Sequence, residues 1–251
     1  ADNIRVDFVL INYTFDGIQF HNESLFDMET MQWNKTLDIP SWATFFTYYF
    51  YFGDAAGNRN ITDARNITVT DNDLPILLKD NTPETSTTGE DFLFSAEFTD
   101  NINISSVWIN YAFDSQDFFN VPLNNINSTL WTFKIRINSR ATNLTYFFNF
   151  EDKANNKNTT LSKILLVRDN DVPIFLSDQT SQLAVTSESF TFILMVADNI
   201  GVTSASVNYT FDNSTFYRQS MYKQNELSWN STIEISSSAV YLEYIFHISD
   251  N

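Results

Sequence analysis

Acidic and amide side chains gather in three separated clusters, and these residues could bind a metal ion. The first cluster is Asp71 with Asp73, the second is Asp100 with Asn101, and the third is Asp152. Carboxylate and amide oxygens without histidine or cysteine suit a hard cation that takes about six to eight oxygen ligands, which indicates calcium. If these carboxylates meet in the fold, they repel one another unless a cation lies among them.

The same clusters return 98 residues further along the chain. Their counterparts are Asp169, Asp171, Asp198, Asn199 and Asp250. Tryptophan recurs at the same interval of 98 residues, at Trp33, Trp131 and Trp229, and no insertion or deletion breaks the register. The chain therefore contains three copies of one module.

The elements that position these residues are strands. Apolar residues in the middle copy alternate with a period of two, as they do on the buried face of a strand. Four rows show it, ending at Phe98, Phe113, Ile137 and Phe150, and shorter candidates are 74–79, 117–123 and 159–167. The sequence predicts an all-β chain of tandem seven-stranded Ig-like β-sandwich modules with a 98-residue repeat, each with its tryptophan in the core.

The expected modules are residues 1–72, 73–170 and 171–251. The middle module is complete, whereas the first is incomplete at its N-terminus and the third at its C-terminus. We interpret the sequence as an excerpt from a longer repetitive chain.

An Ig-like topology places the loops after the second and sixth strands at the pole where the chain enters. The three clusters should therefore converge at each junction, and we favour a calcium site there. The alternative is that each Asp or Asn only caps its own turn through local hydrogen bonds.

The Asp-Asn-Asp-x-Pro boundary at 71–75, Asp-Asn at 100–101 and the Asp-x-Ala-Gly-Asn pattern at 54–58 resemble tandem Ig-like repeats of bacterial and archaeal surface proteins. The linker also resembles, more loosely, the cadherin junction. The resemblance implies a cell-surface, S-layer or filament protein whose junctions are stiffened by calcium. Lys153, beside the third cluster, departs from the pattern.

Composition excludes several classes of function. The formal net charge of −17 argues against nucleic acid and against an anionic membrane surface. There is no cysteine, no Gly-rich phosphate loop, no Gly-x-Ser-x-Gly turn and no apolar run long enough to span a membrane. An acidic pair that recurs in every module fits a structural role, because a catalytic site needs to occur only once. We expect a protein that is not an enzyme.

Asn-x-Ser/Thr sequons are more frequent than composition alone would give, and some should carry N-linked glycans. The favoured positions are Asn12, Asn34, Asn60, Asn158, Asn208 and Asn230. Glycosylation would indicate an archaeal or eukaryotic secretory route, and the composition favours an archaeal surface protein. The alternative is that an Asn- and Thr-rich β protein produces sequons by composition.

Phe45, Tyr49 and Tyr51 should face outward on the first module, where an exposed apolar patch favours an interface. Coverage by glycans or by an adjacent strand is the alternative. Together these features predict an extracellular structural surface protein that self-associates into a filament, sheath or S-layer. The main alternative is the stalk of a cell-surface adhesin that meets a carbohydrate or host surface, and another is a spacer in a carbohydrate-active enzyme.

Overall fold

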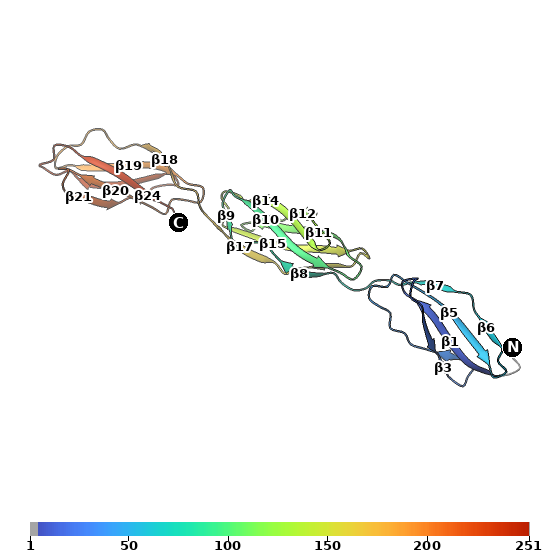
Figure 1. The fold of residues 1–251 in the computed structure, drawn as a ribbon. Coiled ribbons are helices and arrows are strands. Elements are labelled where there is room, and N and C mark those ends of the chain that lie inside the picture. Colours follow the sequence, from blue (N-terminus) through green and yellow to red (C-terminus); the bar gives the residue numbers. More distant parts are fainter. Residues whose placement is uncertain (1–4, 251) are drawn as a thin grey trace.

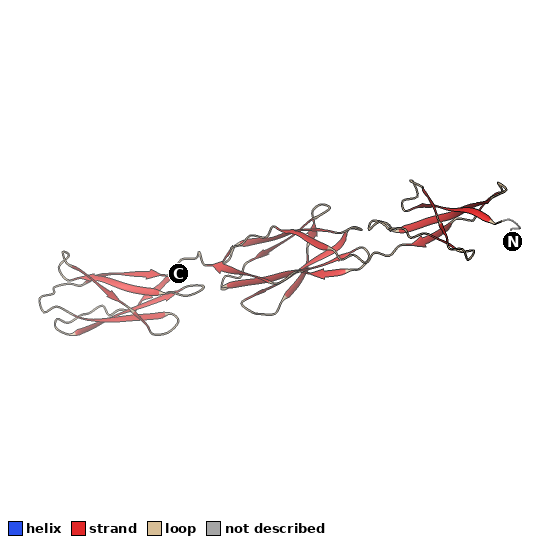
Figure 2. Ribbon diagram, turned by 90° about the horizontal axis from the view of Figure 1, so that it is seen from below, coloured by secondary structure: helices blue, strands red, loops and turns tan. Residues whose placement is uncertain are grey.

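The protein is a row of three β-structured units joined by extended linkers, as a computed structural model describes it for residues 5–250 (Figures 1 and 2). Within these residues, no sheet combines strands from two different units. No helix there is long and apolar enough to cross a membrane. The C-terminal end returns to the pole of the third unit that faces the middle unit (Figure 1).

The middle unit is a two-layer sandwich. Its first sheet has the order β13-β14-β10-β8, and its second has the order β12-β11-β15-β17-β9, with β16 also paired to β15. The strands are β8 (Ile76–Asp80), β9 (Ser86–Thr87), β10 (Asp91–Thr99), β11 (Ile104–Phe113), β12 (Phe119–Pro122), β13 (Asn124–Asn125), β14 (Leu130–Arg136), β15 (Asn143–Asp152), β16 (Lys157–Thr159) and β17 (Lys163–Arg168). The expected Ig-like sandwich is confirmed.

The alternating rows form the core between these two sheets. On β10, Phe94, Ala96 and Phe98 are fully buried, and the polar residues between them lie on the opposite face. Of the residues expected inward, only Tyr111 and Phe133 remain partly exposed. The expected last strand over 159–167 is in fact interrupted, and the parallel pairing of β9 with β17 was not expected.

The third unit repeats this arrangement with sheets β18-β19-β23-β22 and β21-β20-β24. Its strands are β18 (Ile174–Asp178), β19 (Ser189–Ala197), β20 (Ser204–Thr210), β21 (Phe216–Ser220), β22 (Tyr222–Lys223), β23 (Ser228–Glu234) and β24 (Glu243–Ser249). Phe192, Leu194, Val196 and Val207 are fully buried at its centre.

The first unit has one extended sheet, of order β2-β1-β5-β6 with β7 also on β5, and a short β3-β4 pair. Its strands are β1 (Val6–Thr14), β2 (His21–Ser24), β3 (Phe26–Asp27), β4 (Trp33–Asn34), β5 (Phe45–Asp54), β6 (Arg59–Ile61) and β7 (Arg65–Thr68). Trp33 is only partly buried, so the expected core role is wrong there, although it holds for Trp131 and Trp229. The reason is that β10, which pairs with the strand of Trp131, has no counterpart in the described part of this unit.

Candidate metal centres at the module junctions

Three carboxylates meet at the junction between the first and middle units. Asp71 lies in the linker, Asp100 directly follows β10, and Asp152 is the last residue of β15. Each offers a carboxylate oxygen, and these oxygens all lie within 4.8 Å of one another. Two oxygens that each lie about 2.3–2.6 Å from one calcium ion are at most about 5.2 Å apart, so this spacing suits a shared ion.

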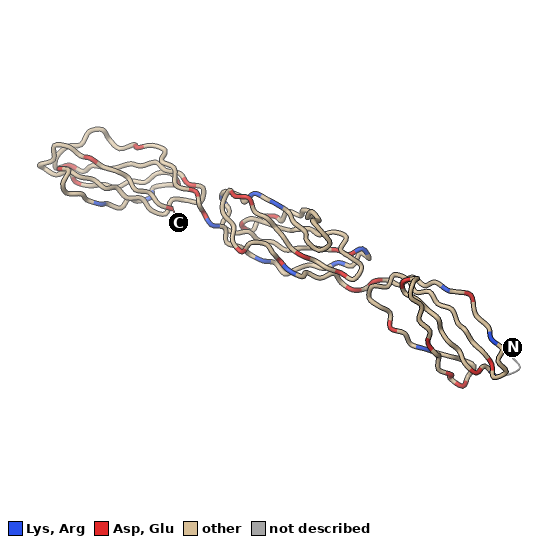
Figure 3. The backbone as a smooth tube through the Cα atoms, in the orientation of Figure 1, with Lys and Arg blue, Asp and Glu red and all other residues tan. Residues whose placement is uncertain are grey.

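The second junction has the same geometry. Asp169 directly follows β17, Asp198 follows β19, and Asp250 follows β24. Their carboxylate oxygens again lie within 4.8 Å of one another. Acidic residues are visible at both linkers in Figure 3. The sequence repeat therefore becomes a repeated spatial group.

An asparagine connects each group to the preceding unit. The Asn101 side-chain amide donates to Asp71 Oδ1 at 2.9 Å and to the Ser41 carbonyl at 2.6 Å. At the second junction, Asn199 donates to Asp169 Oδ1 at 3.0 Å and to the Ser139 carbonyl at 2.7 Å. Ser41 and Ser139 lie in equivalent loops, β4–β5 and β14–β15. Each asparagine thus ties together one unit, the linker and the next unit.

Turn capping accounts for part of this arrangement. Asp152 Oδ1 accepts from the backbone N–H groups of Ala154 and Asn156, at 2.7 and 2.9 Å, and Oδ2 accepts from the Asn156 side chain at 2.9 Å. Asp54 makes the equivalent turn with Asn58 at the far pole of the first unit. Capping explains why an Asp begins this loop, but it does not explain why Asp71 and Asp100 point at the same place.

The group at the first junction is electrostatically strained. Burial raises the pKa of Asp100, and the negative charges of Asp152 and Asp71 raise it further, against the opposing backbone hydrogen bond from Ile102. None of the six clustered carboxylates forms an ion pair within residues 5–250. Lys153 is exposed and does not neutralise the group, so its departure from the pattern leaves the acidic site intact.

Several oxygens of the two groups are buried without a hydrogen-bond partner in the described chain. They are Asp100 Oδ1, Asp169 Oδ2, Asp198 Oδ2 and Asn199 Oδ1. A buried acceptor without a partner costs about 1–3 kcal/mol, and more when it is charged. These orphaned oxygens and the all-oxygen donor set fit a hard cation, which would supply the missing partner.

Two predicted ligands stand outside the groups. Asp73 and Asp171 are exposed and do not belong to the sets of mutually close carboxylates. The reason is local, because the backbone N–H of each is held by the aspartate two residues earlier, at 3.1 Å for Asp71 Oδ1 and 3.2 Å for Asp169 Oδ1. This turn directs the second aspartate away from the first.

The second linker also meets a threonine that the sequence did not single out. Thr88 Oγ1 lies 3.1 Å from Asp169 Oδ1, 3.3 Å from Asn170 Oδ1 and 3.3 Å from Asp171 Oδ2. Thr88 is 2% exposed, and its one hydroxyl hydrogen serves three acceptors. Burial raises the pKa of Asp169, but hydrogen bonds from Asn199, the Asp171 backbone and Thr88 outweigh it, so the pKa is lowered. Thr88 thus anchors the linker to the middle unit.

No family model and no curated protein matches the sequence. Solved structures that are similar include a tetra-tandem repeat from the extending region of a large adhesion protein, with 13% identity and a TM-score of 0.43 over 98% of this chain and 67% of that chain. The FN1–FN3 domains of chicken CNTN1 are similar over 100% of this chain and 91% of theirs, with 8% identity and a TM-score of 0.34. A tandem of titin Ig domains is similar over 70% of this chain and 94% of its own, with 9% identity and a TM-score of 0.34.

These likenesses concern the fold alone. The sheet order by itself describes a tandem array of Ig-like β-sandwich modules.

The six favoured sequons differ in their accessibility. Asn34 and Asn60 are exposed, whereas the other four are partly buried. Asn158 donates to the Pro75 carbonyl at 2.9 Å, Asn208 bonds His247 Nε2 at 3.0 Å, and Asn230 accepts from Gln224 at 3.0 Å. Asn12 Oδ1 is buried without a partner. A glycan attached to Asn34 or Asn60 would therefore disturb fewer contacts of the protein than one attached to the other four asparagines.

The three outward aromatics lie opposite the core of the first unit. Tyr49 and Tyr51 alternate with the core residues of β5, and both are partly exposed. Phe45 is 37% exposed, and Phe8 packs on Tyr51 with ring centroids 5.8 Å apart. The outer face of this unit is thus apolar and aromatic.

Proposed function

We propose that this chain is part of an extracellular structural protein in which calcium fixes Ig-like modules into a stiff row. The observation that carries the proposal is the group of three carboxylates found at both junctions with the same spacing. Each group takes one aspartate from the linker and two from the following module, so an ion there couples linker and module.

The chemistry of the junction favours calcium over magnesium. Magnesium requires near-ideal octahedral geometry and keeps several waters, whereas calcium accepts irregular sets of carboxylate, amide and carbonyl oxygens. Asp71, Asp100 and Asp152 would hold the ion at the first junction, and Asp169, Asp198 and Asp250 would hold it at the second. The ion would offset the burial and the repulsion that together raise the pKa of Asp100.

The ion would act on shape rather than on a reaction. Without it, the junction keeps the hydrogen bonds of Asn101 or Asn199 between the units, the linker contacts of Asn156 or Thr88, and the packing of the linker. A cation among three mutually repelling carboxylates would replace their repulsion by attraction to a shared charge. The modules then remain aligned, as a cell-surface filament, sheath or S-layer requires.

Lateral self-association is the second part of the proposal. The aromatic outer face of the first module, with Phe45, Tyr49 and Tyr51, is the surface that we assign to contacts between copies. N-linked glycans on Asn34 and Asn60 would lie on exposed strands. We assign no catalytic residue.

An adhesin stalk is the alternative function. It is favoured by the end-to-end row of modules, which extends the chain along one direction (Figure 2). A stalk needs the stiff junctions but not the lateral contacts, so the two functions differ in whether copies pack side by side.

Electron microscopy of the native material, imaged in calcium and again after chelation, tests the proposal. We expect ordered filaments or sheets that loosen on chelation. Ordered assemblies that are unchanged after chelation would support the structural function and contradict the calcium junction. Isolated rods in both conditions would support the adhesin stalk.

A further inference from the structure

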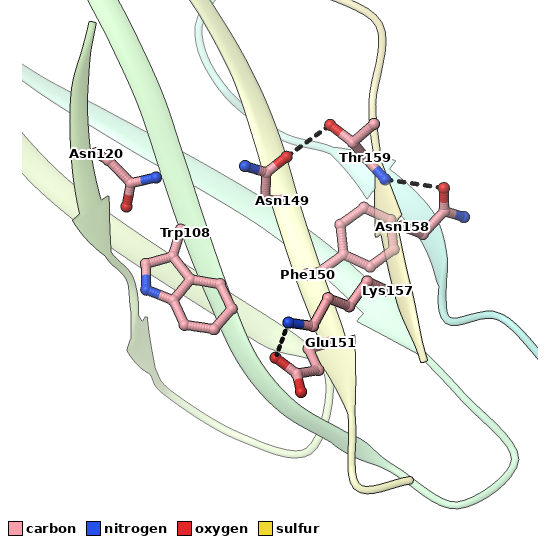
Figure 4. A pocket seen from close by; sticks show the side chains of 8 residues that line it. All are labelled: Trp108, Asn120, Asn149, Phe150, Glu151, Lys157, Asn158 and Thr159. Atoms are coloured by element: carbon pink, nitrogen blue, oxygen red, sulfur yellow. Dashed lines mark hydrogen bonds and ion pairs between the residues drawn. The ribbon is translucent and has the colours of Figure 1, made fainter. Parts of the chain in front are cut away.

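The outer face of the middle module contains a hollow of about 460 Å³ that has no role at the junctions (Figure 4). Its size lies within the range of about 300–1,000 Å³ that is usual for small-ligand sites. Four strands contribute to it, β11, β12, β15 and β16. The side chains that matter are Trp108, Asn120, Asn149, Glu151, Lys157 and Thr159.

Strand register sets these side chains in rows. Trp108 on β11 lies opposite Asn149 on β15, and Asn149 lies opposite Thr159 on β16. Glu151 and Lys157 form the next row, one step along the same strands. One indole therefore faces a line of polar groups across the sheet, as Figure 4 shows.

Existing hydrogen bonds leave ligand-binding capacity in this line. The Thr159 hydroxyl donates to Asn149 Oδ1 at 2.7 Å, so the side-chain N–H groups of Asn149 remain available. Asn120 uses its amide nitrogen on Asn110 at 2.9 Å, and its oxygen can still accept. Lys157 Nζ and Glu151 Oε2 are 3.7 Å apart and largely solvated on the lysine side. The hollow thus offers both donors and acceptors.

The internal repeat shows that the fold does not require a tryptophan at position 108. The inward neighbour Ile109 is matched by Ile11 and Val207, which are likewise buried. Trp108, by contrast, corresponds to Leu10 in the first module and to Ser206 in the third. The inward position therefore stays apolar in all three modules, whereas the outward position beside it does not.

The chemistry of the hollow matches a neutral sugar ring. A pyranose has an apolar face of C–H groups that can lie on an aromatic plane, and a rim of hydroxyls that donate and accept hydrogen bonds. Trp108 supplies the plane, while Asn120, Asn149 and the Glu151–Lys157 pair supply the rim contacts. The paired charges cancel, and the chain's net charge of −17 disfavours an anionic ligand.

We infer that this hollow is a binding site for a neutral saccharide on the middle module. The first module has a smaller hollow of about 280 Å³ at equivalent positions, lined by Phe52, Gly53, Arg59 and Asn60, and no tryptophan lines it. The site on the middle module adds a recognition function to a structural repeat. Binding here does not depend on the junction ions, because the hollow takes no residue from the six clustered carboxylates.

The test uses the full chain, made without glycans in a bacterial host and labelled with ¹⁵N. Maltotriose, N,N′-diacetylchitobiose and lactose are titrated while the indole N–H signal of Trp108 and the side-chain amides of Asn120 and Asn149 are followed. We expect at least one probe to shift these signals in a saturable way. In Trp108→Leu, which copies Leu10 of the first module, we expect affinity to fall at least tenfold.

One control variant and one further binding-site variant complete the test. Phe216→Leu removes an exposed aromatic from the third module and should leave binding unchanged. Asn149→Ala should weaken binding while the backbone spectrum stays native. Absence of any saturable shift with all three probes, or equal shifts in Trp108→Leu, would overturn the inference.

The saccharide can come from another molecule or from this chain, because the sequon at Asn158 borders the hollow. A comparison of glycosylated wild type with glycosylated Asn158→Gln separates the two sources. Stronger binding of the added probe by the variant would identify the chain's own glycan as the resident ligand. Equal binding would identify an external saccharide.

Discussion

The side-chain amide of Asn101 donates to the Ser41 carbonyl at 2.6 Å, across the boundary between the first and middle modules. The same bond recurs between Asn199 and Ser139 at 2.7 Å. Because both asparagines also bond the linker aspartate, each junction has a direct contact in addition to its acidic group. The direct contact sets the relative position of the modules, and the ion is expected to hold it closed.

Replacing Asn101 with alanine should loosen the first junction without unfolding either module. Two side-chain hydrogen bonds are lost, each with a net contribution of about 0.5–1.5 kcal/mol. Small-angle X-ray scattering of the variant should show a broader distribution of intramolecular distances, because the angle between the two modules varies more. Asn72→Ala is the matched control, because Asn72 is exposed in the same linker. An unchanged scattering profile for Asn101→Ala would show that the bond does not align the modules.

Calcium should stabilise the middle and third modules. A ligand that binds only the folded state adds about 2.7 kcal/mol when its concentration is 100 times its Kd. The midpoint temperature of thermal unfolding, followed by circular dichroism, should therefore rise when calcium is added and fall back on chelation. Magnesium at the same concentration should produce a smaller shift. Equal shifts with both ions would indicate general charge screening instead of a specific site.

Asp80 should make the middle module sensitive to acid. Burial opposes ionisation of Asp80, but Lys163, Thr82 and Tyr146 outweigh it and lower its pKa in the folded state. A lowered pKa adds stability above the unfolded value of 3.8, and this stability is lost as the pH falls through the lower folded value. Asp80→Asn should therefore cost about 1–3 kcal/mol at pH 7 and progressively less below pH 3.8.

Urea unfolding at pH 7 and in acid measures this difference. The side chain of Asp80 is 7% exposed, so solvent screens its interactions little. Asp91→Asn is the surface control, because the Asp91–Lys134 pair is more than half exposed and solvent screens it, so its loss should change stability little. A loss for Asp80→Asn that stays constant with pH would contradict the role of its charge.

The repeated tryptophans should differ in their contribution to stability. Trp131 is 7% exposed between the two sheets of its module, so Trp131→Ala should cost about 3–5 kcal/mol. Trp33 is only partly buried, and Trp33→Ala should cost clearly less. Urea unfolding of both variants measures the two losses. Equal losses would mean that the first module has a second layer equivalent to that of the middle module.

Much of the fold could be predicted from the sequence because its signals are local and periodic. Apolar residues occupy every second position from Phe92 to Phe98, and β10 buries these positions while Leu93 on the other face stays exposed. The 98-residue repeat then places equivalent loops at equivalent poles. The predicted topology therefore places Asp71, Asp100 and Asp152 at one junction, where the structure also has them.

The remaining features depend on contacts that spacing does not encode. Asp73 was expected beside Asp71, but a turn between the two directs it outward. Thr88 reaches the second linker only because β9 pairs with β17 in parallel, and a pairing of two residues leaves no periodic signal. The Ser41 carbonyl is a backbone atom, which no pattern of residue types marks. The hollow at Trp108 needs the register of four strands.

The measurement that tests the central claim most directly is isothermal titration of the full chain with calcium at pH 7. Two ions should bind per chain, and Asp100→Asn and Asp198→Asn should each reduce this to one, because each removes a carboxylate from a different group. The double variant should bind none at the same concentrations. Absence of binding by the wild type, or an unchanged stoichiometry in the double variant, would contradict the calcium-bridged junction.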